Sequence, residues 1–103
     1  MEPPVGMERH EVPTVFVNGS ATPDDVQYVE ARLCEALRMA PAVRYCVLWI
    51  DMTVAAPTVE IEAGTRIEVV RARESAASAR AAGDASIASL ARQLSPVLVE
   101  NGA

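Results

Sequence analysis

The spacing of hydrophobic residues changes along this chain in a fixed order. A short apolar run at 14–17 precedes a stretch with helical spacing, and three strand-like segments then lead to a second helical stretch. Apolar residues three or four apart mark one face of a helix, whereas alternation marks a half-buried strand. The order therefore predicts an α+β fold: a single β-α-β-β-β-α domain with a four-stranded sheet and two helices packed on one face.

The first helix has the clearest boundaries. Thr22 is a typical N-cap residue, Pro23 follows at the first helical position, and the acidic Asp25 stands three residues after the cap. Each of these features stabilises a helix N-terminus. The helix should end before Pro41, and its apolar stripe comprises Val26, Val29, Leu33 and Leu37.

The central segments alternate as strands do. The segment 44–52 is apolar on both faces, which indicates a central strand, or a strand with helices on one face and a partner on the other. In the segment 58–63, Glu60 and Glu62 should face solvent. A tight turn at Gly64 leads to a last strand over 66–74, in which two adjacent valines would accommodate a bulge.

The second helix has weaker signals. Ser75 is a suitable N-cap, Gly83 weakens the middle by ~1 kcal/mol relative to Ala, and Pro96 should end the helix near Ser95. Its apolar stripe comprises Ile87, Leu90 and Leu94. The predicted organisation is a flexible N-terminal tail over 1–13, one domain over 14–98 and a frayed C-terminus over 99–103.

No residue pattern indicates catalysis. The single histidine, His10, lies in the predicted tail, and Cys34 and Cys46 lack metal-binding spacing. The cysteines are better explained as buried thiols in a reducing compartment. The chain has no apolar run of membrane-spanning length, and its acidic N-terminus is not a secretory signal. We expect a cytoplasmic protein that is not an enzyme and has no cofactor, no metal and no small-molecule substrate.

The basic residues are the remaining candidates for function. All nine are arginines, although the net charge is −5, which by itself argues against non-specific nucleic-acid binding. A high-GC genome explains the bias simply, whereas a functional interpretation is that the planar guanidinium suits phosphate contacts. On physical grounds alone, solvated charges paired with nearby acids are favoured over a shallow patch that tracks RNA phosphates. The candidate arginines for such a patch are Arg32, Arg38, Arg66, Arg71, Arg73, Arg80 and Arg92.

Several segments resemble the short bacterial ribosome-hibernation factors, the family of hibernation-promoting factor and the ribosome-associated inhibitor. The similarity extends over roughly 14–98, and the composition is nearest to the dormancy-associated actinobacterial members. The matching segments are Val15-Phe16-Val17-Asn18-Gly19, Thr22-Pro23, the stretch from Tyr28 to Leu33, Ala81-Ala82-x-Asp84, and Leu90-Ala91-Arg92-Gln93-Leu94.

The resemblance implies a protein that binds the small ribosomal subunit and its ribosomal RNA. Such a factor occupies the channel of messenger RNA and tRNA, and so inhibits translation in dormancy or stress. Arg32 and Arg92 match basic positions of the family's helices, whereas the other candidates match by region. Longer members carry a C-terminal domain that pairs ribosomes, so this chain is a short form or part of a longer protein.

A second hypothesis is a protein-interaction or dimerisation module on the same fold, without RNA binding. The acidic net charge and the two-sided apolar strand favour it, and burial of Trp49 in a homodimer would distinguish it.

Overall fold

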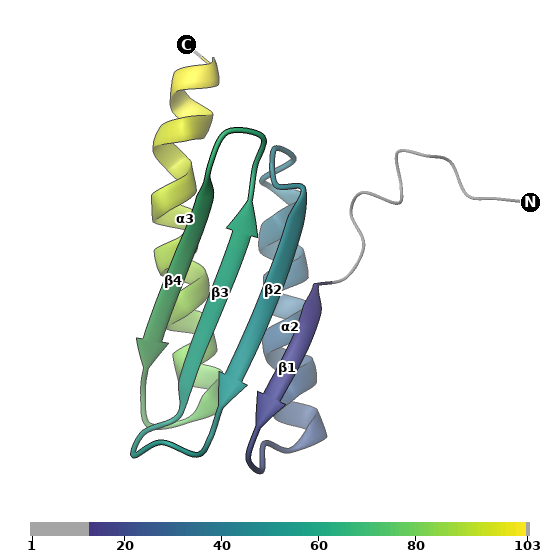
Figure 1. Ribbon diagram of the computed structural model, residues 1–103, viewed down its shortest axis with the longest axis vertical. Helices are drawn as coiled ribbons and strands as arrows, with labels where there is room; N and C mark the ends of the chain where they lie inside the picture. The colour runs from purple at the N-terminus through teal and green to yellow at the C-terminus, as the bar shows by residue number, and fades with distance from the viewer. Residues whose placement is uncertain (1–12, 103) are drawn as a thin grey trace, which may run out of the picture.

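A computed structural model describes the backbone of residues 13–102 and the side chains of residues 13–94, and it confirms the predicted order of elements (Figure 1). The elements are β1 (Thr14–Asn18), α2 (Pro23–Arg38), β2 (Tyr45–Asp51), β3 (Thr58–Gly64), β4 (Val69–Ser75) and α3 (Ala79–Gly102). The predicted tail lies outside the described residues except for Pro13.

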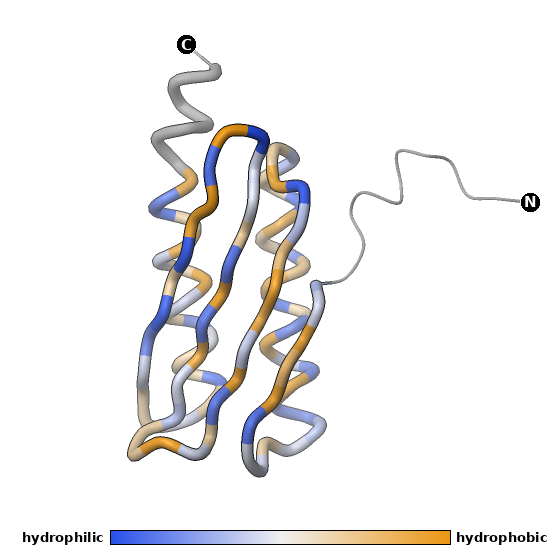
Figure 2. Tube along the Cα trace, in the orientation of Figure 1, coloured by the Kyte–Doolittle hydropathy of each residue, from blue (hydrophilic) through white to orange (hydrophobic). Residues whose placement is uncertain are grey.

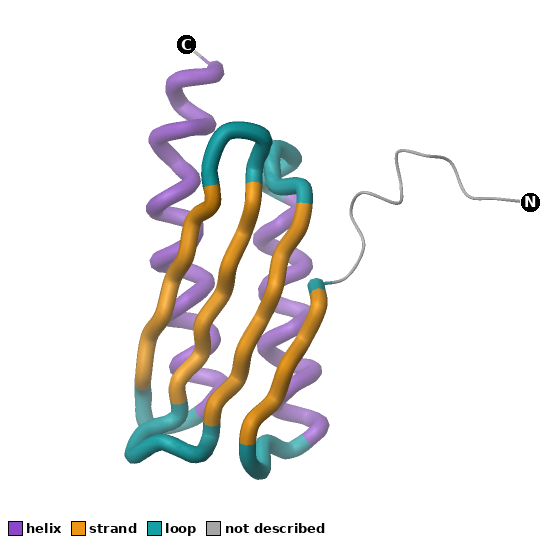
Figure 3. Tube along the Cα trace, viewed as in Figure 1, coloured by secondary structure: helices purple, strands orange, loops and turns teal. Residues whose placement is uncertain are grey.

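The four strands form one mixed sheet in the order β1-β2-β3-β4. β1 is parallel to β2, and the remaining neighbours are antiparallel. A parallel pair needs a long crossover connection, which α2 supplies. Both helices lie against one face of the sheet and leave the other face open, as Figure 3 shows. We call this uncovered side the open face.

The core lies between the sheet and the helices. Leu48 of β2 and Ile61 of β3 point towards the helices and are fully buried, as are Val29 and Leu33 of α2. Hydrophobic and hydrophilic positions alternate along β3 (Figure 2), so that its glutamates face away from the core. The alternation therefore directs the apolar residues of the strand to one side, as the sequence predicts.

The start of α3 differs from the prediction. Ser75 belongs to β4, where it pairs with Thr58 across the ladder and their hydroxyls lie 2.7 Å apart. The N-cap is Ser78, whose hydroxyl accepts a hydrogen bond from the amide of Ala81 at 3.1 Å. Strand pairing thus extends β4 and moves the helix start along the chain.

Two further details also differ. The pairing of β3 with β4 is continuous from Thr58↔Ser75 to Gly64↔Val69, so it contains no bulge. The helix α3 passes through Pro96 and reaches Gly102, beyond the predicted end near Ser95. Proline removes one amide donor, but its fixed φ is compatible with helical backbone.

Gly83 marks a close approach between the helices. A Cβ atom at this position would lie 2.7 Å from Cγ2 of Val29, which is buried on α2. The residue predicted as a weak point of α3 is thus a point at which α2 packs too closely against it to leave room for a side chain. In the part of the chain that the structure describes, neither helix is long and apolar enough to cross a membrane.

Candidate nucleic-acid interface

Three of the candidate arginines form ion pairs. Arg32 lies 3.3 Å from Asp84, Arg71 lies 2.9 Å from Glu62, and Arg80 lies 2.7 Å from Asp25. Their side chains remain 48–64% exposed. Arg32 and Arg80 lie on the helices, whereas Arg71 and Arg73 lie on the open face. The candidate arginines therefore do not form one patch.

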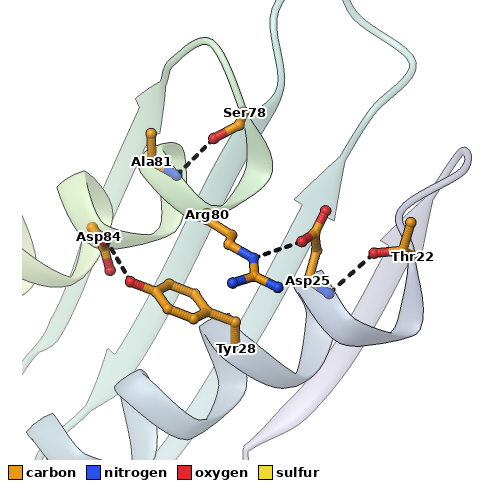
Figure 4. Close-up of polar contacts among 7 residues, drawn as sticks. All are labelled: Thr22, Asp25, Tyr28, Ser78, Arg80, Ala81 and Asp84. Atoms are coloured by element: carbon orange, nitrogen blue, oxygen red, sulfur yellow. Dashed lines mark hydrogen bonds and ion pairs between the residues drawn. The ribbon is translucent and has the colours of Figure 1, made fainter.

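Tyr28 lies at the centre of the pairs between the helices (Figure 4). Its hydroxyl donates to Oδ2 of Asp84 at 3.0 Å, and the guanidinium of Arg80 lies over its ring, 4.7 Å from the centroid. Arg32 approaches the same ring at 5.8 Å, and its Nε contacts Oδ1 of Asp84 without hydrogen-bond geometry. These contacts join α2 to α3, so they are first of all an interhelical clamp.

The pair of Arg80 and Asp25 makes the clamp sensitive to pH. The hydrogen bond from Arg80 lowers the pKa of Asp25 below its ordinary value of 3.8, and the Thr22 hydroxyl acts in the same direction. The folded protein therefore binds this proton more weakly than the unfolded chain does. The resulting stabilisation is present above pH 3.8 and is lost as the pH falls through the depressed pKa.

We accordingly expect the urea midpoint to fall between about pH 6 and about pH 3, and to fall less in Asp25→Asn. The control is Glu35→Gln, because Glu35 is exposed on α2 and forms no ion pair within the described residues. An identical pH dependence in Asp25→Asn and in the wild type would contradict the role assigned to this carboxylate.

The remaining arginines lie differently. Arg38 is in the last turn of α2, Arg44 directly precedes β2, and Arg66 is in the turn between β3 and β4. The end of α2, the start of β2 and this turn all lie at the same end of the sheet (Figure 1). The amide of Arg44 donates to the carbonyl of Gly64 at 2.7 Å, which holds two of these segments together.

Arg92 lies beside this end. Its neighbour Gln93 donates a side-chain hydrogen bond to the carbonyl of Arg71, near the start of β4. Within residues 13–94, none of these four arginines forms an ion pair with a carboxylate. We call this group the arginine end; its members are Arg38, Arg44, Arg66 and Arg92.

The charge of the domain is thus unevenly distributed. Asp24 and Asp25 begin α2 and Asp51 ends β2, so these acids lie at the opposite end of the sheet from the arginine end. Glu68, in the same turn as Arg66, and Glu35, one helical turn before Arg38 on α2, are exceptions. Sequence reasoning missed Arg44, because its proximity to Arg66 follows from the pairing of Tyr45 with Gly64. Only a predicted register for that hairpin could have identified it.

The cysteines are structural rather than reactive. Cys46 is buried and Cys34 is partly buried, and both are free thiols. Burial raises the pKa of Cys46 to about 12, so its nucleophilic thiolate is scarce at neutral pH. In the described part of the chain, no group of three or more His, Cys, Asp and Glu residues is arranged to hold a metal ion.

Solved structures of other proteins share this architecture, and one of them is a ribosomal subunit interface protein. A ribosomal subunit interface protein from Coxiella burnetii aligns with a TM-score of 0.74 and 13% identity, covering 84% of this chain and 96% of its own. The N-terminal domain of Protein Y from Thermus thermophilus aligns with a TM-score of 0.67 and 20% identity, covering 82% and 96%. No protein-family model and no curated protein matches the sequence. The likeness confirms, for the fold, the resemblance found in the sequence.

Proposed function

We propose that this protein binds the small ribosomal subunit in the channel of messenger RNA and tRNA, and so inhibits translation in dormancy or stress. The observation that carries this proposal is the fold, which matches a ribosomal subunit interface protein over 84% of the chain. Steric exclusion from the channel requires no catalytic step. The protein would act in the cytoplasm, where ribosomes are found.

The arginine end is the surface best suited to RNA phosphates. Its guanidinium groups have no carboxylate partner within the described residues, so contact with phosphate breaks no existing ion pair. Strands of seven residues span about 23 Å, nearly three Debye lengths at physiological salt. The acids at the opposite end are therefore screened from RNA bound here, and the net charge of −5 does not prevent binding.

The paired arginines are expected to contribute less. An exposed ion pair is worth about 0–1 kcal/mol, so exchanging its carboxylate for a phosphate costs little. The carboxylates of Asp25, Glu62 and Asp84 would nevertheless remain beside the phosphate and repel it. This reduces the expected role of Arg32, one of the two arginines that best match the family.

Co-sedimentation with purified small subunits over a series of salt concentrations tests the proposal. We expect binding at low salt. The logarithm of the affinity should fall linearly with the logarithm of the salt concentration, because each neutralised phosphate releases counterions. Subunits preloaded with messenger RNA and tRNA should bind less, because the channel is occupied. Absence of binding at low salt, binding indifferent to salt, or undiminished binding to preloaded subunits would each contradict this function.

A further inference from the structure

The open face carries an aromatic pair, of which Phe16 is exposed and Trp49 is partly buried. Phe16 of β1 and Trp49 of β2 are cross-strand partners, their ring centroids lie 6.1 Å apart, and their planes differ by 18°. Phe16 is 52% exposed, although it is one of only four aromatic residues in the chain. Neither helix covers these rings, because both helices pack on the opposite face (Figure 3). Aromatic area left in water in so small a domain points to a binding surface.

Polar groups continue the same row across the sheet. The register aligns Phe16, Trp49, Glu60 and Arg73 on β1 to β4 in turn. An open depression of about 430 Å³ lies here, bordered by Trp49, Glu60 and Arg73. A volume of this size is within the range of small-molecule sites.

Most of the other charged groups around the depression are already engaged. Glu62 accepts hydrogen bonds from Tyr45 at 2.9 Å and from Arg71 at 3.0 Å, and these bonds lower its pKa. Oδ1 of Asp51 accepts bonds from the amide and the hydroxyl of Thr53, which lower the pKa of this carboxyl, and its negative charge also interacts with Arg73.

Two charged side chains around the depression have no hydrogen-bond partner within residues 13–94. Within the described residues, Glu60 and Arg73 form no side-chain hydrogen bond and no ion pair, although they are cross-strand partners. The site therefore offers an aromatic ring, one hydrogen-bond-accepting carboxylate and one guanidinium.

We propose that this depression binds a single-stranded RNA nucleotide, with a preference for guanine. The base stacks on Trp49, the carboxylate of Glu60 accepts hydrogen bonds from the guanine N1–H and N2–H groups, and Arg73 contacts the phosphate. Stacking on exposed aromatic side chains and hydrogen bonds to the base edges are the usual means of reading single-stranded RNA. The inference rests on the proposed function for its partner class, since a ribosome-bound protein meets single-stranded RNA.

The remaining charges favour a nucleotide over a basic peptide. Arg71 and Glu62 neutralise each other. A peptide rich in lysine or arginine could therefore use the carboxylates of Glu60 and Asp51 but would be repelled by Arg73. A nucleotide instead uses both signs of charge, since its base edge donates hydrogen bonds and its phosphate is anionic. The complementarity is therefore to RNA.

Tryptophan fluorescence tests this site directly, because Trp49 is the single tryptophan of the chain. We expect a guanosine trinucleotide to quench the emission and to bind about tenfold more tightly than a uridine trinucleotide, which is a typical effect of a specific base contact. Arg73→Gln should weaken both ligands and reduce the salt dependence. The full chain is used throughout.

The decisive variant is Glu60→Gln. Removal of a negative charge should strengthen the binding of any RNA through electrostatics. Glutamine, however, keeps only one of the two oxygens that accept from guanine, so guanosine binding should weaken and the preference should disappear. Opposite effects on the two trinucleotides would therefore support the site, and an equal gain for both would overturn the assignment of Glu60. The matched control is Glu35→Gln on α2, which removes the same charge on the far side of the sheet and should leave the preference unchanged.

Other outcomes identify other occupants. Quenching by an arginine-rich peptide but by neither trinucleotide would overturn the proposal in favour of a peptide partner. A change in emission with protein concentration alone, together with a dimer in analytical ultracentrifugation, would assign the face to a second copy of the chain. If small subunits bind the protein but trinucleotides leave Trp49 unchanged, this inference fails and the proposed function stands. If trinucleotides quench Trp49 but small subunits do not bind the protein, the proposed function fails and this inference stands.

Discussion

Replacement of Arg38, Arg66 and Arg92 by glutamine is expected to weaken binding to the small ribosomal subunit on the order of 100-fold at physiological salt. Each phosphate contact contributes about 0.9 to the slope of log affinity against log salt, so three lost contacts reduce the slope by about 2.7. Between 1 M and 0.15 M salt that difference in slope corresponds to a factor on the order of 100. Co-sedimentation of the variant over the same salt series measures both quantities.

The matched control replaces the ion-paired arginines, Arg32, Arg71 and Arg80, by glutamine. It removes the same total charge. Each of these arginines, however, lies beside a carboxylate that repels phosphate, so its loss should matter less for RNA binding. We expect a loss of affinity of about tenfold or less. Equal losses in the two triple variants would show that total charge, rather than the arginine end, determines binding. Circular dichroism of both variants confirms that they are folded.

Replacement of Gly83 by alanine is expected to destabilise the protein by about 1–3 kcal/mol, the usual cost of overpacking a core. Helix propensity alone predicts the opposite sign, because alanine is favoured over glycine by about 1 kcal/mol in a helix interior. The new methyl group would, however, lie 2.7 and 2.9 Å from the two methyl groups of Val29, which is fully buried. Urea denaturation at neutral pH measures the difference in free energy of unfolding.

A second substitution tests the cause of this effect. A Val29→Ala background removes both methyl groups and leaves only the Cβ atom of position 29, 3.3 Å from the new methyl group, so Gly83→Ala should be neutral or should stabilise by up to about 1 kcal/mol. Val29→Ala alone lowers stability, since it removes buried methyl groups. Stabilisation by Gly83→Ala in the wild-type background would show that the helices can separate at no cost, contrary to the close packing described above.

The two solved structures with a similar fold share few residues with this chain. The identities of 13% and 20% are low enough that the similarity concerns the backbone arrangement and not particular side chains. The arginine end and the depression beside Trp49 are therefore inferred from this chain's own residues. The triple variants test the arginine end, whereas fluorescence of Trp49 tests the depression.

Local chemistry was sufficient to predict the order of the elements. The N-cap at Thr22 and the end of the first helix before Pro41 agree with the structure, because capping and hydrophobic spacing act within a few residues. The alternation in β3 correctly directed Glu60 and Glu62 away from the core. The predicted cap at Ser75 was wrong because pairing with Thr58, seventeen residues away, extends β4.

The candidate site depended on contacts between distant parts of the chain. Arg80 meets Asp25 across 55 positions, and Tyr28 meets Asp84 across 56, so no local pattern indicates which arginines are neutralised. The arginine end likewise brings together two loops and two helices that are separate in sequence. The sequence by itself thus determined which segments become helices and strands and which face of each is apolar. Only the tertiary structure decided which charges are paired and which remain free, because pairing depends on distances in space.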